Sequence, residues 1–160
     1  MKNAIRTAAL LTILLAVHSP ANAADEYKWI GQVTEEGASL SYAIPESDAI
    51  KIDFHCERKT RKIVVSFEHE PKTAKDGVRL ATRLSVRGRE AGTLDLVMTG
   101  QRLEFDDKFL LQGEIRMGPQ LRRILAEGGT LVVEVDGQME EIPLKSVAQA
   151  ARQLLASCPG

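Results

Sequence analysis

This chain has few aromatic residues and little net charge, and both shortages exclude classes of function. Its 160 residues include one Trp, two Tyr and four Phe, which argues against a stacking platform for bases or sugars. The formal net charge is −1, so the sequence lacks the excess of positive charge on which nucleic-acid binding depends. We therefore expect no nucleic-acid partner.

The common motifs of catalysis and metal binding are also missing. The sequence contains no H-E-x-x-H, no C-x-x-C and no G-x-S-x-G. His55 and His69, with Glu68 or Glu70, would suit zinc binding or acid–base chemistry if they lay together. Strand alternation instead places His55 on a polar face and His69 on an apolar face, so we expect the two rings to point apart. We expect no catalytic residue, no metal site, no cofactor and no enzymatic activity.

The N-terminal segment has the pattern of a secretory signal peptide. Lys2 and Arg6 precede an apolar run over 8–17, and 21–23 reads Ala-Asn-Ala, a small-residue cleavage site. Cleavage would remove residues 1–23 and leave a single domain over 24–160, with 19 basic and 22 acidic residues and a net charge of −3. No later stretch approaches the roughly 18 to 20 apolar residues that span a bilayer. We expect a soluble, exported, periplasmic protein.

The two cysteines, Cys56 and Cys158, are most simply a disulfide in an exported protein. Cys56 follows Ile50, Ile52 and Phe54 on the apolar side of an alternating strand. Val147, Ala151, Leu154 and Cys158 form one apolar stripe at helical spacing. Both sulfurs should therefore face the same core, and the bond should attach the last helix to a central strand.

The rest of the pattern is mostly period two, which predicts antiparallel strands. The clearest strand runs over 78–86, another covers 94–98, and Gly100-Gln101 is expected to turn the chain. Helices are expected near 119–127, opening on Pro119, and near 146–157, where Ser146 and Gln149 have the spacing of a capping box. The predicted fold is mainly β, an antiparallel β-sandwich or flattened barrel of about eight to ten strands with these two helices.

Four arginines form the most distinctive surface feature. Arg79, Arg83 and Arg87 share the polar face of the 78–86 strand, and Arg89 follows closely. Guanidinium groups bind carboxylates and phosphates in two-point contacts, so this row is a possible binding patch for an acidic protein surface, a cell-wall carboxylate or a lipid phosphate. The alternative is a solvated strand face whose arginines pair with carboxylates such as Asp95.

Two partial resemblances bear on function. The first involves the pattern from Leu121 to Gly129, the strand over 130–135, Ile142-Pro143-Leu144 and the helix ending at Cys158. Together these segments resemble the tail of small exported proteobacterial proteins of the invasion-associated locus B type. Phe54-His55-Cys56 followed by the strand over 63–67 resembles the C-type lysozyme inhibitors, whose lysozyme-contacting loop motifs have no clear match here. The first resemblance implies an envelope or host-interaction factor, and the second an inhibitor.

These observations lead to one expected function and one alternative. We expect a non-enzymatic binding protein whose partner is an unidentified envelope or secreted protein, or a cell-wall glycan. The alternative is an inhibitor of a secreted hydrolase such as lysozyme, a role that suits a rigid scaffold with a protruding polar loop. The oligomeric state does not follow from the sequence.

Overall fold

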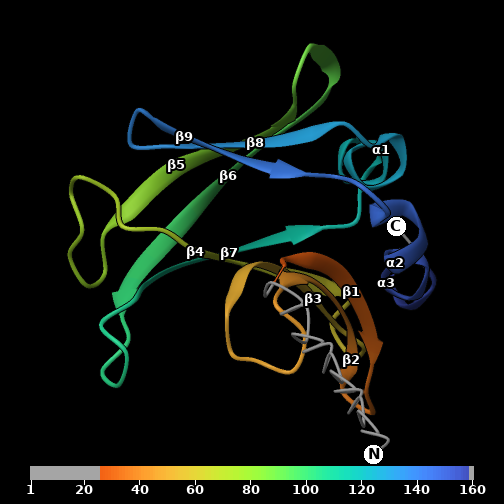
Figure 1. Ribbon diagram of the computed structural model, residues 1–160, viewed down its shortest axis with the longest axis horizontal. Coiled ribbons are helices and arrows are strands. Elements are labelled where there is room, and N and C mark those ends of the chain that lie inside the picture. The colour runs from red at the N-terminus through yellow and green to blue at the C-terminus, as the bar shows by residue number, and fades with distance from the viewer. Residues whose placement is uncertain (1–25, 159–160) are drawn as a thin grey trace, which may run out of the picture.

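The computed structural model describes residues 26–158, with the backbone alone at 90 and 91. The signal peptide expected over 1–23 lies outside these residues. Within them the chain is mainly β, as predicted, and nine antiparallel strands form one continuous sheet that curls into a half-barrel (Figure 1). The strands are β1 (Lys28–Val33), β2 (Gly37–Ala43), β3 (Ile50–Glu57), β4 (Lys62–Glu68), β5 (Arg79–Val86), β6 (Arg89–Arg102), β7 (Phe109–Arg116), β8 (Thr130–Val135) and β9 (Gln138–Pro143).

The order of strands across the sheet is β1-β2-β3-β4-β7-β6-β5-β8-β9. Alternate residues of each strand face the concave side, as period-two patterning requires. On β3 these are Ile52, Phe54 and Cys56, all fully buried, and on β4 they are Ile63, Val65 and Phe67, also fully buried. The concave face is therefore the core of the protein.

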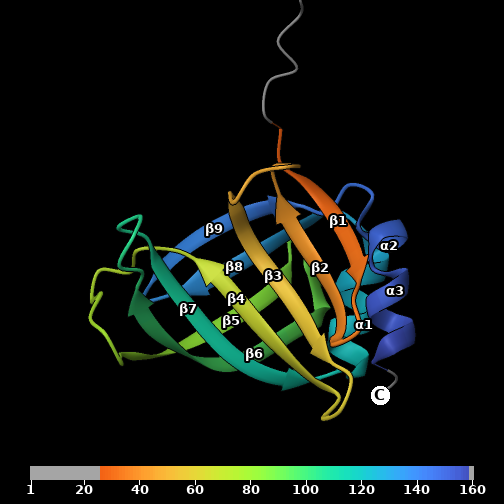
Figure 2. The ribbon, with the colours of Figure 1, turned by 90° about the horizontal axis from the view of Figure 1, so that it is seen from below.

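Three helices cover the open side of the half-barrel (Figure 2): α1 (Pro119–Glu127), α2 (Val147–Ala150) and α3 (Arg152–Ser157). Helix α1 begins at Pro119, as predicted, and is followed by Gly128 with φ of 69°, a conformation that glycine tolerates best. Its buried face is Leu121, Ile124 and Leu125. The helices complete the core that a single curled sheet leaves exposed.

The helix expected over 146–157 is interrupted, and Ser146 stands at its N-cap position without capping it through the side chain. Ser146 has φ of 65° and its side chain makes no capping hydrogen bond. Ala151 lies between α2 and α3, with φ of −72° and ψ of −11°, and the two are separate short helices. At this break a Cβ on Gly31 of β1 would collide with the carbonyl oxygen of Ala150. A residue without a side chain is what lets β1 and α2 pack this closely.

The turn expected at Gly100-Gln101 is also wrong, because β6 continues to Arg102. Gly100 is buried in the strand, where the ring of Phe109 on the neighbouring strand β7 occupies the space that a Cβ would take. The glycine thus serves close packing between strands rather than a turn. The chain turns instead between Leu103 and Lys108, whose backbone groups hydrogen-bond at 2.8 Å.

The disulfide between Cys56 and Cys158 is confirmed. It joins β3 to the end of α3 with the two Cα atoms 6.2 Å apart, and both residues are fully buried. The alternation of buried residues along β3 and the apolar side of the C-terminal helices bring both sulfurs into the same core. The bond therefore attaches the helical cover to the centre of the β1–β4 half of the sheet.

The edges of the sheet, β1 and β9, approach each other through side chains. The indole nitrogen of Trp29 on β1 donates a hydrogen bond to the carbonyl oxygen of Pro143 on β9 at 2.7 Å. Glu140 of β9 accepts contacts from Lys51 of β3 at 2.6 Å and His69, just after β4, at 3.0 Å. These long-range contacts hold the two walls of the half-barrel together at one end.

Candidate functional site

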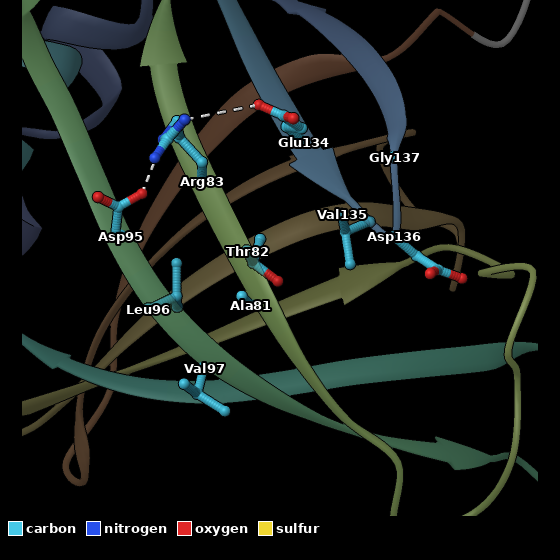
Figure 3. A pocket seen from close by; sticks show the side chains of 10 residues that line it. All are labelled: Ala81, Thr82, Arg83, Asp95, Leu96, Val97, Glu134, Val135, Asp136 and Gly137. Atoms are coloured by element: carbon cyan, nitrogen blue, oxygen red, sulfur yellow. Dashed lines mark hydrogen bonds and ion pairs between the residues drawn. The ribbon is translucent and has the colours of Figure 1, made fainter.

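The arginine row lies on the outer face of the sheet, and Arg83 is its best-defined member. Its guanidinium lies between two neighbouring strands, with Nε 2.8 Å from Asp95 on β6 and Nη1 4.0 Å from Glu134 on β8 (Figure 3). A hollow of about 450 Å³ beside it is lined by three carboxylates, those of Asp95, Glu134 and Asp136, but by one guanidinium. An anion entering there would meet mostly negative charge.

Two of the other three arginines of the row are also paired with carboxylates. Arg87 forms an ion pair with Glu141 of β9, and Arg89 lies 2.9 Å from Glu127 at the end of α1. Among the described residues Arg79 has no ion-pair partner. The structure therefore places Arg79, Arg83 and Arg87 on one mixed-charge surface, with the pairing to Asp95 that the sequence suggested as an alternative. Binding by this patch stays a prediction.

The two histidines lie apart, as strand alternation predicted. The ring of His69 stacks on buried Phe67 with centroids 5.3 Å apart, and its Nδ1 contacts Glu140. His55 alternates with buried Phe54 and Cys56 and so faces the other side of β3. Within residues 26–158 no cluster of three or more His, Cys, Asp or Glu side chains is placed to hold a metal ion.

A surface that the sequence reasoning missed surrounds the connection between β6 and β7. Of the seven aromatic side chains, Phe105 alone is exposed, and it is fully exposed. The connection projects beyond the body of the sheet (Figure 1). The hollow beside it is lined by four carboxylates and one guanidinium; we call this surface the acidic end, and its charged residues are Asp48, Asp76, Arg102, Glu104 and Asp106.

Arg102 of the acidic end and Lys108 beside it are both paired with carboxylates. Arg102 lies 2.5 Å from Glu70 and 3.1 Å from Asp107. Lys108 lies 3.0 Å from Glu68 and 3.7 Å from Asp106. Because neighbouring carboxylates hold both cations, the excess negative charge around Phe105 is available to a partner.

A second surface that the sequence reasoning missed is a cleft between the beginning of β1 and the end of β9. It contains the only Trp and both Tyr residues of the chain. The ring of Tyr42 stacks on Tyr27 with centroids 5.4 Å apart and lies 5.3 Å from the ring of Trp29. We call this the aromatic cleft; its lining is Glu26, Tyr27, Lys28, Trp29, Tyr42, Ile44, Pro45, Pro143, Lys145 and Ser146. The low aromatic count argued against a surface on which a ligand could stack, but the Trp and both Tyr residues lie together in this cleft.

Comparison with known proteins gives no family: no protein-family model, no curated protein and no solved structure matches this chain. None of the helices within 26–158 is both long and apolar enough to traverse a bilayer. The acidic end and the aromatic cleft are therefore the observations from which a function can be argued.

Proposed function

We propose that this chain is a soluble periplasmic binding protein without enzymatic activity, and that it acts on an envelope protein or a cell-wall ligand. The observation that carries the proposal is Phe105, a fully exposed aromatic side chain in a projecting loop with excess negative charge around it. An aromatic anchor that enters a partner's pocket is a common centre of binding energy. The surrounding carboxylates favour a partner with a basic surface.

The geometry of the loop supports docking rather than catalysis. The carboxylates around Phe105 come from separate connections, Asp48 before β3, Asp76 before β5 and Glu104 beside Phe105 itself. The loop is anchored, since Asp76 accepts a hydrogen bond from the backbone amide of Arg102 at 2.7 Å. A partner would thus meet a surface whose shape is largely set before binding, which lowers the entropy cost of association.

Site-specific photocrosslinking tests the proposal. A photoreactive amino acid would replace Phe105 in the exported, disulfide-intact protein, and the matched control would carry it at Val33, which is half-exposed on β1. We expect a partner with a basic surface to be captured from position 105 alone. Its binding to the purified protein should weaken in Phe105→Ala and with added salt. Capture of the same proteins from Val33, or binding unchanged by Phe105→Ala, would contradict the proposal.

The periplasmic part of the proposal has its own measurement. Export would be supported by recovery of the protein in the periplasmic fraction with an N-terminus at Ala24, read by mass spectrometry. An intact N-terminal segment in the cytoplasmic fraction would argue against it.

The projecting loop also favours the second candidate, inhibition of a secreted hydrolase such as lysozyme. A preformed loop that enters a partner's cleft loses little entropy on binding, and an exposed Phe flanked by carboxylates suits a cleft with basic rims. The assay is hydrolysis of cell-wall substrate by lysozyme with increasing amounts of protein. Complete inhibition near one equivalent, lost in Phe105→Ala, would support inhibition. Full hydrolase activity at a large excess of protein would exclude lysozyme as the target.

A further inference from the structure

The aromatic cleft has the size and lining of a small-ligand site. Its volume is about 590 Å³, within the roughly 300 to 1,000 Å³ usual for such sites. It lies between the two edges of the sheet, which the hydrogen bond from the Trp29 side chain on β1 to the carbonyl oxygen of Pro143 on β9 bridges. One wall is the buried indole of Trp29, which also lies 6.4 Å, centroid to centroid, from Phe54 in the core. The cleft is thus fixed to the rigid part of the fold.

Four polar side chains of the cleft have no hydrogen-bond or ion-pair partner within residues 26–158. Among the described residues, neither the Tyr27 hydroxyl nor the Tyr42 hydroxyl has a hydrogen-bond partner. Lys28 and Lys145 are exposed and have no carboxylate within ion-pair distance in the same part of the chain. Many other cations differ, since Lys51, Lys62, Arg83, Arg87, Arg89, Arg102 and Lys108 all have ion-pair partners.

These groups define the chemistry of a ligand. The negative faces of tyrosine rings attract the weakly positive C–H groups of a sugar ring. Tyrosine hydroxyls are protonated at neutral pH and bind sugar hydroxyls as donors and acceptors. Lysine ammonium groups bind a carboxylate as point charges. A purely apolar ligand would leave the hydroxyls and ammonium groups unsatisfied.

We propose that the aromatic cleft binds a carboxylated saccharide. The tyrosine pair would contact the sugar ring while Lys28 and Lys145 bind its carboxylate. This inference rests on the proposed function, because it specifies the cell-wall ligand as an acidic sugar. It is independent of the acidic end, which has a different partner and a different test.

The only tryptophan of the chain lines the cleft, so its fluorescence reports binding there. Three disaccharides would be titrated into the disulfide-intact protein: the N-acetylglucosamine–N-acetylmuramic acid pair, digalacturonate and neutral chitobiose. We expect a saturable fluorescence change with at least one carboxylated sugar and binding weaker by more than about tenfold for chitobiose. Preference between the first two sugars would distinguish a muramic from a uronic ligand.

Variants connect the signal to the cleft. Lys145→Gln and Lys28→Gln should each weaken binding about fivefold, the effect of one partly exposed ion pair. Tyr27→Ala should weaken it further, whereas Lys59→Gln, an exposed lysine in the turn between β3 and β4, should leave it unchanged. Equal melting temperatures would show that the variants are folded. No saturable signal, equal affinity for chitobiose, or equal losses in Lys145→Gln and Lys59→Gln would overturn the proposal, and none of these results would alter the crosslinking from Phe105.

Discussion

Removing the Cys56–Cys158 disulfide should eliminate a large part of the stability of this protein. The two residues are 102 positions apart. Opening a loop of this length raises the entropy of the unfolded chain by about 16 cal/mol/K, which amounts to about 4.7 kcal/mol at 25 °C. Domains of this size usually unfold with a free energy of roughly 5 to 15 kcal/mol. The loss of this bond alone would thus remove from about a third to nearly all of that free energy.

The assay is urea unfolding of the oxidised protein and of the Cys56→Ala/Cys158→Ala variant, followed by Trp29 fluorescence. We expect the variant to lose about 4 to 5 kcal/mol and its melting temperature to fall by roughly 10 to 20 °C. Both sulfurs are fully buried, so the alanines also leave a small cavity. The reduced wild-type protein, which retains both sulfur atoms, is the control for that contribution.

Hydrogen exchange shows which part of the fold loses stability when the disulfide is removed. Helix α3 packs on β1, β2 and β3, and the disulfide cross-links its end to β3, far from the backbone connection of the helices to β9. Amides over 147–158 should therefore lose protection first on reduction, before those of β5, β6 and β8. A loss of stability below about 1 kcal/mol, or unchanged protection of 147–158, would refute the reasoning that the bond both restricts the unfolded chain and holds the helical cover.

Three further substitutions have defined expected outcomes. Thr82 is buried with a hydroxyl that lacks a partner in the described structure, so Thr82→Val should stabilise by about 1 kcal/mol in urea unfolding. Gly31→Ala should cost about 1 to 3 kcal/mol in the same assay, because the new Cβ collides with the Ala150 carbonyl. Burial raises the pKa of Asp53 above 3.8, although the Ser41 hydrogen bond opposes the shift. As pH rises from about 3.8, the unfolded state therefore loses its proton before the folded state does. The free energy of unfolding falls until the folded state has also lost its proton. Asp53→Asn should therefore raise the melting temperature at pH 7, and the gain should disappear as pH approaches 3.8.

The parts of the fold that the sequence predicts are those governed by local periodicity. Alternation along β3 put Cys56 in the core, and the helical stripe through Leu154 put Cys158 there, so the disulfide was predictable from two local patterns. Pro119 gave the first residue of α1 for the same reason, since its effect on the backbone is local.

The errors arise where a distant residue decides the outcome. In the sequence alone, Gly100 has the character of a turn residue. In the fold, the ring of Phe109 on the next strand fills the space that a Cβ on Gly100 would need, so the glycine serves packing. Likewise, nothing near Arg89 in the sequence indicates that Glu127 at the end of α1 will pair with it. These relations depend on the sheet order, which periodicity does not encode.

The candidate sites were the least predictable part. Tyr27 and Trp29 are neighbours in the sequence, but Tyr42 joins them through the pairing of β1 with β2, and Lys145 through the contact of β1 with the end of β9. The exposure of Phe105 depends on the turn between Leu103 and Lys108, which was expected earlier in the chain. The composition gives the number of aromatic residues but not their positions in the fold.

The strand order also has a consequence for how the protein reaches its native state. The sheet consists of three meanders, β1–β4, β5–β7 and β8–β9, each made of hairpins that close locally. In the part of the chain that the structure describes, two pairings, β4 with β7 and β5 with β8, join them across long stretches of chain. Because closing long loops slows folding, we expect the meanders to form early and their docking to limit the folding rate. In that pathway, β4 and β5 are the strands on which assembly of the whole sheet depends.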